Sequence, residues 1–169
     1  MKTHLLPNLS LGLATIGALL QAGAQLFAVA VIVGTVTQAP PRSLAIYNGE
    51  YGYDSGPFWE VVPAITLLLL LVALIANWRT ARRRLVISAF GLFVLAGLFA
   101  AFVTGPLQAE LISAGFADSV DPTLAALAAR WHALDWASWA LTLVPGVLLV
   151  SAMFVPPTAP PRPIGPSAI

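Results

Sequence analysis

The sequence predicts an all-α integral membrane protein, a bundle of four transmembrane helices with both termini in the cytoplasm. Of its 169 residues, 59% are hydrophobic and only 9% are charged, whereas a soluble domain carries about 25% charged residues. The apolar residues gather in four segments that are long enough to cross the hydrocarbon core of a bilayer. Once these segments are placed across a membrane, the charges separate by sign, and this separation predicts the orientation.

All seven acidic residues fall on one side of the predicted membrane, and six of the eight basic residues fall on the other. The acidic residues are Glu50, Asp54, Glu60, Glu110, Asp118, Asp121 and Asp135. The basic residues opposite them are Lys2, Arg79, Arg82, Arg83, Arg84 and Arg162. Because Lys and Arg are enriched in cytoplasmic loops, the short connector at residues 79–84 is predicted to be cytoplasmic and the acidic side to face outward.

The first predicted helix covers residues 9–36. Lys2 before an apolar run also fits a signal peptide, with the small residues 22–24 as a cleavage site. However, the apolar run continues to Val33, well beyond the 7–15 residues of a signal-peptide core. A retained transmembrane helix is therefore the preferred interpretation.

The second and third predicted helices cover residues 58–78 and 85–103, on either side of the basic connector. The connectors at residues 37–57 and 105–122 then lie outside. The first of these is rich in tyrosine and in turn-forming residues such as glycine, and we expect it to fold back over the bundle.

The fourth predicted helix covers residues 124–154. Asp121 followed by Pro122 indicates its start, because aspartate caps helix N-termini and proline suits the first helical position. The helix is longer than one crossing requires, so its first turns are expected outside the hydrocarbon layer. The four helices form one predicted domain, residues 1–155, and residues 156–169 are predicted to be a proline-rich cytoplasmic tail.

Composition also excludes some classes of function. The chain has no cysteine, which rules out disulfides and thiolate metal sites. Nucleic-acid binding is not expected, because the only basic cluster is a short connector between apolar segments. We predict a multi-pass protein of the bacterial inner membrane, with the lipid bilayer as its first partner; the sequence does not identify a cofactor or a metal.

Polar side chains inside spanning helices are costly and often mark functional sites. The fourth helix has the densest set, with His132, Asp135, Trp136 and Trp139 at a spacing that places them on one helix face. A histidine one turn from a carboxylate suits a proton acceptor or a metal ligand. The alternative is interfacial anchoring, since tryptophans commonly lie at headgroup level.

Other polar residues are expected near this face. Glu60, near the outer end of the second helix, is predicted to be a second acid of the cluster; the alternative is an exposed carboxylate at the water boundary. Gln21 and Gln25 lie one turn apart on the first helix, where amides either bond neighbouring helices or line a polar pocket. Thr104 and Gln108 are predicted to close the cavity.

Two short motifs resemble the DUF1772 group, which includes the anthrone oxygenase-like membrane proteins. The first motif falls at the end of the third helix and the second falls in the fourth helix. Their matching residues are Thr104, Pro106, Leu107, Gln108 and Leu111, and then Trp131 and His132. The chain departs from the group in two ways: Gln108 stands where Asn is usual, and the arginine often found after the Trp is absent. The resemblance implies a four-helix membrane fold and oxygenation of a reduced polycyclic aromatic without an evident cofactor.

Three functions remain open, and only one of them is enzymatic. In the first, a membrane oxygenase, His132 supported by Asp135 acts as general base on a phenol or enol. The predicted catalytic residues are His132, Asp135 and Glu60, and the predicted ligand-binding residues are Gln21, Gln25, Thr104, Gln108, Trp131, Trp136 and Trp139. The second function is a non-catalytic accessory subunit of a larger membrane complex. The third is binding of a quinone, lipid or other hydrophobic small molecule.

Overall fold

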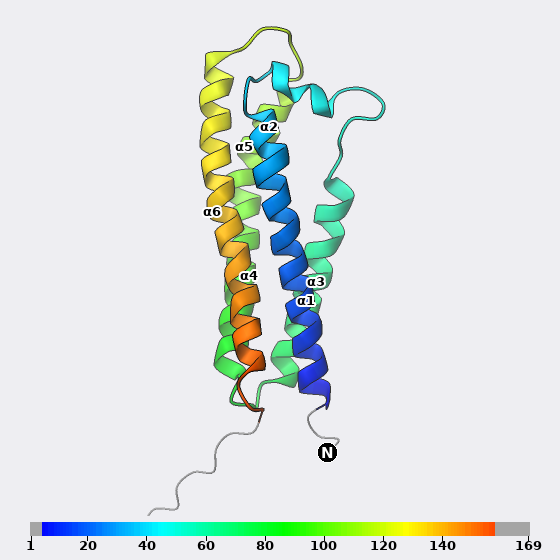
Figure 1. The fold of residues 1–169 in the computed structure, drawn as a ribbon, viewed down its shortest axis with the longest axis vertical. Helices are drawn as coiled ribbons and strands as arrows, with labels where there is room; N and C mark the ends of the chain where they lie inside the picture. The colour runs from blue at the N-terminus through cyan, green and yellow to red at the C-terminus, as the bar shows by residue number, and fades with distance from the viewer. Residues whose placement is uncertain (1–4, 158–169) are drawn as a thin grey trace, which may run out of the picture.

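The computed structural model describes residues 5–157, and helices make up most of this part of the chain (Figure 1). Four helical stretches are long and apolar enough to cross a membrane: Leu5–Val36, Gly56–Ala76, Arg83–Ser113 and Pro122–Met153. The predicted all-helical class and the four apolar helices are therefore confirmed. Most of the predicted tail lies outside the described residues, as do Lys2 and Arg162.

The first helical stretch changes its winding along its length. It begins as α1 (Leu5–Phe27), continues as the π-helical segment η2 (Ala28–Val33) and ends as α2 (Gly34–Val36). It starts four residues before the predicted residue 9 and ends at the predicted residue 36. The sequence contained no indication of the π-helical segment.

The third stretch extends well beyond its predicted end at residue 103. Here α4 (Arg83–Phe99) passes into a second π-helical segment, η4 (Ala100–Thr104), and then into α5 (Gly105–Ser113). The prediction placed an outer connector from residue 105 onward. The helix instead continues, and Pro106 lies in the first turn of α5, directly after the π-helical segment.

The two remaining stretches are α3 (Gly56–Ala76) and α6 (Pro122–Met153). The predicted cap of the last helix is confirmed, since the Asp121 side chain accepts from the backbone N–H of Thr123 at 2.7 Å. The helix begins at Pro122, two residues earlier than predicted, because the proline occupies its first turn.

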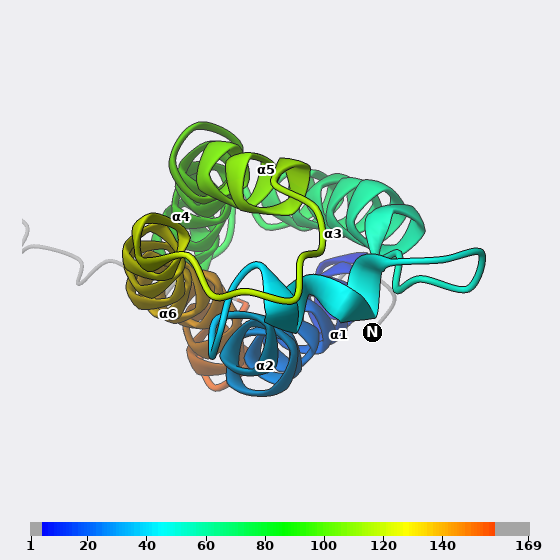
Figure 2. The same cartoon turned by 90° about the horizontal axis from the view of Figure 1, so that it is seen from above.

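The four stretches stand around a common axis (Figure 2). α1 packs against both α3 and α6, and α4 packs mainly against α6. α3 is the shortest stretch, and the other three continue past it at one end of the bundle (Figure 1). We call this end, where α2 and α5 lie, the outer end, and the end with the α3–α4 connector the inner end.

Two separate hydrophobic cores hold the bundle together. The inner core contains Leu11, Ala14, Ala18, Leu70, Ala73, Val86, Ala89, Phe93, Leu149 and Ala152. The outer core contains Val33, Val36, Leu44, Leu111, Ala128 and Trp131. On α1 and η2 the residues between Ala18 and Val33 lie between the two cores, and this is where Gln21 and Gln25 occur.

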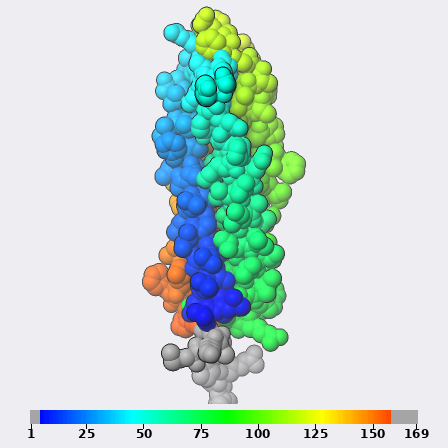
Figure 3. All heavy atoms as spheres, turned by 90° about the vertical axis from the view of Figure 1, so that its right-hand side faces the viewer, coloured from blue at the N-terminus to red at the C-terminus, as the bar shows by residue number. Residues whose placement is uncertain are grey.

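The outer end is closed by the two connectors on that side. The first contains a short 3-10 helix, η3 (Arg42–Tyr47), and the second joins α5 to α6. The two connectors touch where Pro41 pairs with Val120 and the N–H of Asp121 donates to the Pro40 carbonyl at 3.0 Å. In the space-filling view both connectors gather over the outer end of the helices (Figure 3).

The inner end is held by Arg82, which is only 6% exposed. Its Nε donates to the Val155 carbonyl at 2.6 Å, and its Nη1 donates to Asn8 Oδ1 at 2.6 Å. A connector residue thus joins the start of α1 to the residues that follow α6. The nearby Asn77 reaches α1 in the same way, since its Nδ2 donates to the Pro7 carbonyl at 3.2 Å.

Candidate functional site

A cavity of about 770 Å³ lies between the inner and the outer core. All four helical stretches contribute to its wall, together with residues 53–55 and Tyr47. Its volume falls within the range of about 300–1,000 Å³ that is common for small-molecule sites. The division of the hydrophobic interior into two cores therefore leaves room for a bound molecule at the level where the predicted polar residues gather.

Large apolar and aromatic side chains form much of the cavity wall. Trp59 comes from α3, Phe93 from α4 and Trp131 from α6, while Tyr47 and Tyr53 come from the outer connector. Trp131 is 2% exposed and belongs to the outer core as well as to the cavity wall. Walls of this kind favour an apolar or aromatic ligand.

A polar stripe on α6 faces the same cavity. It consists of Asp135, Ser138 and Thr142, one helix turn apart from each other. Ser138 Oγ accepts from Gln25 Nε2 at 2.9 Å, and Thr142 Oγ1 donates to the Ser138 carbonyl at 3.0 Å. Asp135 takes no part in these bonds, so its half-buried carboxylate remains available to a ligand.

Gln21 provides a second available acceptor. Its Oε1 is buried and has no hydrogen-bond partner in the structure, and the residue lines the cavity. More than about 90% of buried polar groups in proteins have a partner. A ligand donor or a water in the cavity would satisfy this oxygen.

Both π-helical segments lie at the cavity. η2 contributes Ala28, Ile32 and Val33, and η4 contributes Ala100, Ala101 and Thr104. π-helical turns are rare and occur frequently at functional sites. Pro106 is the signal that could have indicated the second one, because a proline cannot donate the backbone bond that would continue the α-helical register.

Gly105 is required at the end of η4. A Cβ at this position would lie 2.9 Å from the carbonyl oxygen of Ala100, within the same helical segment. Because a side chain cannot approach a backbone oxygen so closely, the local winding depends on glycine. The widened turn is therefore favoured by the Gly-Pro pair at 105–106.

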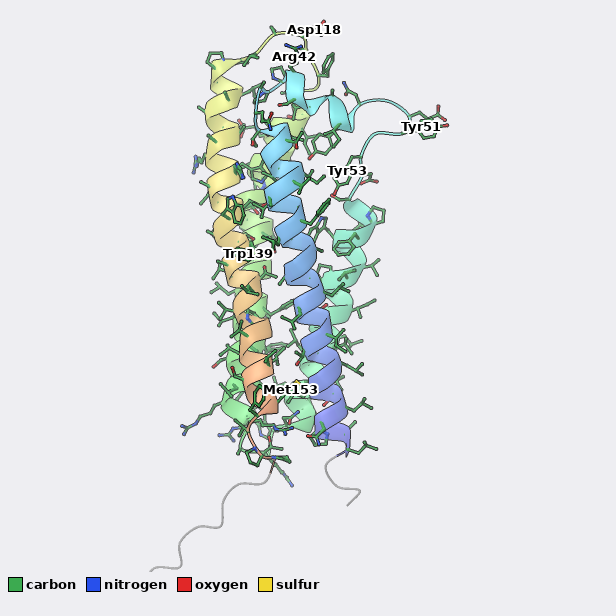
Figure 4. All side chains as sticks on the ribbon, viewed as in Figure 1. Arg42, Tyr51, Tyr53, Asp118, Trp139 and Met153 are labelled. Carbon is green, nitrogen blue, oxygen red and sulfur yellow. The ribbon has the colours of Figure 1, made fainter. Side chains whose placement is uncertain are left out.

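The connector between α2 and α3, which contains η3, forms a roof over the cavity. The N–H of Tyr53 donates to the Ile46 carbonyl at 2.8 Å, which folds the chain back after η3. The rings of Tyr47 and Tyr53 lie 6.1 Å apart and both residues line the cavity. Burial, and then the neighbouring Tyr53, raise the pKa of the Tyr47 hydroxyl above its ordinary value. Tyr51, by contrast, is 91% exposed at the tip of the loop and points away from the bundle (Figure 4).

The structure brings six of the ten predicted site residues to the cavity. These are Gln21, Gln25, Thr104, Gln108, Trp131 and Asp135. The other four, His132, Trp136, Trp139 and Glu60, are absent from the cavity wall. Glu60 is exposed on α3, and its neighbour Trp59 faces the cavity instead.

The geometry of α6 explains why only Asp135, of the four residues predicted to share one face, lines the cavity. Successive residues are rotated by about 100°, so Trp131, Asp135, Ser138 and Thr142 form one stripe along the helix. His132, Trp136 and Trp139 form a second stripe, and Asp135 lies only about 60° from His132. The spacing that places four residues on one face is too coarse to decide which of them turns inward.

His132 is bound to a tryptophan. Its Nε2 accepts from Trp136 Nε1 at 3.1 Å, and the two rings stack with their centroids 6.4 Å apart. Trp139, about halfway along α6 (Figure 4), packs edge to face against Trp136, with the two rings perpendicular and their centroids 5.6 Å apart. The predicted support of His132 by Asp135 has no hydrogen bond in the described part of the chain, where Trp136 donates to His132 instead.

The prediction omitted Ser138 and Thr142 as site residues. Both are buried, at 1% and 3% exposed, and they share a stripe with Trp131 and Asp135. Two hydroxyl residues four apart in an apolar helix, on the stripe of a tryptophan and a carboxylate, were a usable signal in the sequence.

Within the described residues no group of three or more histidine, aspartate or glutamate side chains could hold a metal ion. No protein-family model, curated protein or solved structure matches this chain. The resemblance of two short motifs to the DUF1772 group stays a prediction, and the geometry of the cavity carries the functional argument.

Proposed function

We propose that this is a multi-pass membrane protein that binds a hydrophobic small molecule in the cavity between its two cores. The observation that carries the proposal is the cavity itself, about 770 Å³ in volume, with aromatic walls and a buried Gln21 oxygen that lacks a partner. Apolar walls with a few convergent polar groups are typical of ligand sites. Of the three functions expected from the sequence, binding of a hydrophobic ligand has the most support.

A route to the cavity exists along the seam between α3 and η4. α3 packs against α4, to which it is joined at the inner end, but across the described residues its contacts with η4 and α5 are slight. The cavity residues Gly97, Ala100 and Ala101 are exposed on this side of the bundle. Because the seam lies within an apolar stretch of helix, a ligand dissolved in the bilayer would reach the cavity sideways.

The other two functions have less support. An oxygenase needs a base in contact with its substrate, and the predicted base His132 is not part of the cavity wall, whereas Asp135 is. A role as an accessory subunit rests on the small size of the chain and on its plain apolar surface. No feature of the cavity is specific to an oxygenase or to an accessory subunit.

The binding proposal is tested by narrowing the seam. Replacing Ala101 with tryptophan should abolish saturable binding of phenylnaphthylamine, a neutral fluorescent probe, to the protein in lipid nanodiscs. Ala30→Trp is the matched control, since Ala30 is an exposed alanine of the other π-helical segment and does not line the cavity. Equal binding by both variants, or no saturable binding by the unchanged protein, would contradict the proposal.

We also propose that both termini are cytoplasmic and that the membrane is the bacterial inner membrane. The charge separation supports this orientation, because Arg79, Arg82, Arg83 and Arg84 lie at the inner end and the acidic residues lie toward the outer end. The chain has no cysteine, so single cysteines can report accessibility. Thr80→Cys should react with a membrane-impermeant maleimide only in opened cells, and Ser55→Cys should react in intact cells. The reverse pattern would refute the orientation.

A further inference from the structure

The chemistry of the cavity wall also restricts the charge of the ligand. Resting on the proposed binding function, we propose that the cavity selects an amphipathic cation, such as a hydrophobic amine or quaternary ammonium compound, over neutral and anionic molecules of the same size. The polar head of the ligand would lie between Asp135 and the aromatic side chains, and its apolar part would extend toward the seam between α3 and η4.

The first reason is the charge of the wall. Two carboxylates line the cavity, Asp135 in its interior and Asp54 at the outer connector. Among the described residues no lysine, arginine or histidine lines it. Asp54 is exposed on its connector, and its Oδ1 already accepts from the N–H of Gly56 at 2.8 Å. Asp135 is therefore the carboxylate that a ligand would meet inside the cavity.

The second reason is that acceptor oxygens in the cavity wall remain without partners. The Nε2 of Gln25 is occupied by Ser138, and the hydroxyl of Thr142 is occupied by a backbone carbonyl. The oxygen of Gln21 has no partner, and Asp135 adds two more acceptor oxygens. A head group that donates hydrogen bonds or carries positive charge matches these oxygens, whereas the negative charge of a carboxylate or phosphate head group would be repelled by Asp135.

The third reason is the aromatic wall. Tyr47, Tyr53, Trp59 and Trp131 line the cavity from three different parts of the chain. The face of an aromatic ring attracts cations, most strongly for tryptophan, and sets of such rings recognise quaternary ammonium groups. Aromatic residues and a carboxylate around one cavity favour the same charge, while the inner wall, with Phe93 and Pro63, accommodates an apolar chain.

The experiment uses three competitors with one hydrocarbon chain. Dodecyltrimethylammonium, dodecanol and dodecanoate are titrated against bound phenylnaphthylamine in nanodiscs, below the concentrations that disturb the bilayer, with empty nanodiscs to correct for partitioning. The ammonium compound should displace the probe at a concentration at least about tenfold lower than dodecanol or dodecanoate does, which means an affinity about tenfold higher. Asp135→Asn should remove this advantage, so that the ammonium compound and dodecanol displace the bound probe at similar concentrations.

The matched control is Glu60→Gln, which neutralises an exposed carboxylate of α3 that does not line the cavity. It should leave all three titrations unchanged. Helical circular dichroism and the unfolding transition of Asp135→Asn in detergent check that this variant is folded. Equal displacement by the three competitors, or an ammonium advantage that survives Asp135→Asn, would overturn the charge selectivity while the binding function stands. Absence of saturable probe binding by the unchanged protein would remove both.

Discussion

Replacing Trp131 with alanine is expected to lower the free energy of unfolding by about 3–5 kcal/mol, the usual cost of truncating a large buried aromatic residue. Trp131 is 2% exposed and is the largest side chain of the outer core, where it packs with Val33, Val36 and Leu111. It also lines the cavity, so its removal joins the cavity to the space left in the core. The surrounding helices cannot close that space without moving the connectors above it.

The measurement is chemical or thermal unfolding in detergent micelles, followed by helical circular dichroism. Trp136→Ala is the control, because Trp136 lies on the same helix but is 39% exposed and outside both cores. We expect it to cost less than about 1 kcal/mol, as is usual for surface substitutions. If Trp131→Ala lowered the free energy of unfolding by as little as Trp136→Ala, the outer core would contribute little to stability.

The difference between these tryptophans also shows which features of the structure the sequence could predict. Periodic apolar segments and the charge separation were sufficient to predict four spanning helices, because both signals are averaged over many residues. Which tryptophan is buried depends on a rotation of one residue, about 100°, and on which helices are neighbours. Trp131 and Trp136 have the same chemistry and both belong to the predicted cluster, so spacing within that cluster did not separate them; only the hydroxyl residues on the stripe of Trp131 could have done so.

The two π-helical segments mark a second limit. Each changes the register by about one residue in the middle of a long helix, and so changes which side chains face the bundle axis after it. Thr104 and Gln108 reach the cavity through such a segment. In a uniform α-helix Thr104 would lie about 20° around the helix from Phe93 and Gln108 about 60° from it, so a uniform extrapolation fits Gln108 less well than Thr104. The prediction placed them near the cavity from their position at the outer end alone.

The roof of the cavity depends on single backbone positions. A Cβ at residue 52 would lie 2.5 Å from the carbonyl oxygen of Tyr47, so the fold of this connector requires Gly52. This contact brings Tyr53 back to the cavity and leaves Tyr51 outside. Turn-forming residues predicted that the connector folds back over the bundle. Which of its three tyrosines line the cavity depends on contacts between residues five apart.

At the inner end, Arg82→Ala is expected to cost about 3 kcal/mol of unfolding free energy, since breaking a buried charged network leaves its partners without donors. The substitution removes the donors to the Val155 carbonyl and to Asn8 Oδ1, and so separates three parts of the chain that the guanidinium joins. The sequence suggested only a role in orientation for all four connector arginines. The structure distinguishes Arg82, which is 6% exposed, from Arg79, Arg83 and Arg84, which are exposed.

Two comparison variants separate the bonds from the charge. Arg84→Ala removes an equal charge from the same connector and should cost less than about 0.5 kcal/mol, as expected for an exposed residue. Arg82→Lys keeps the charge but loses the planar fork of donors, so it should recover only part of the stability. Unfolding in detergent measures all three. If Arg82→Lys were as stable as the unchanged protein, the inner end would need only a positive charge there, and the two bonds at 2.6 Å would not account for its stability.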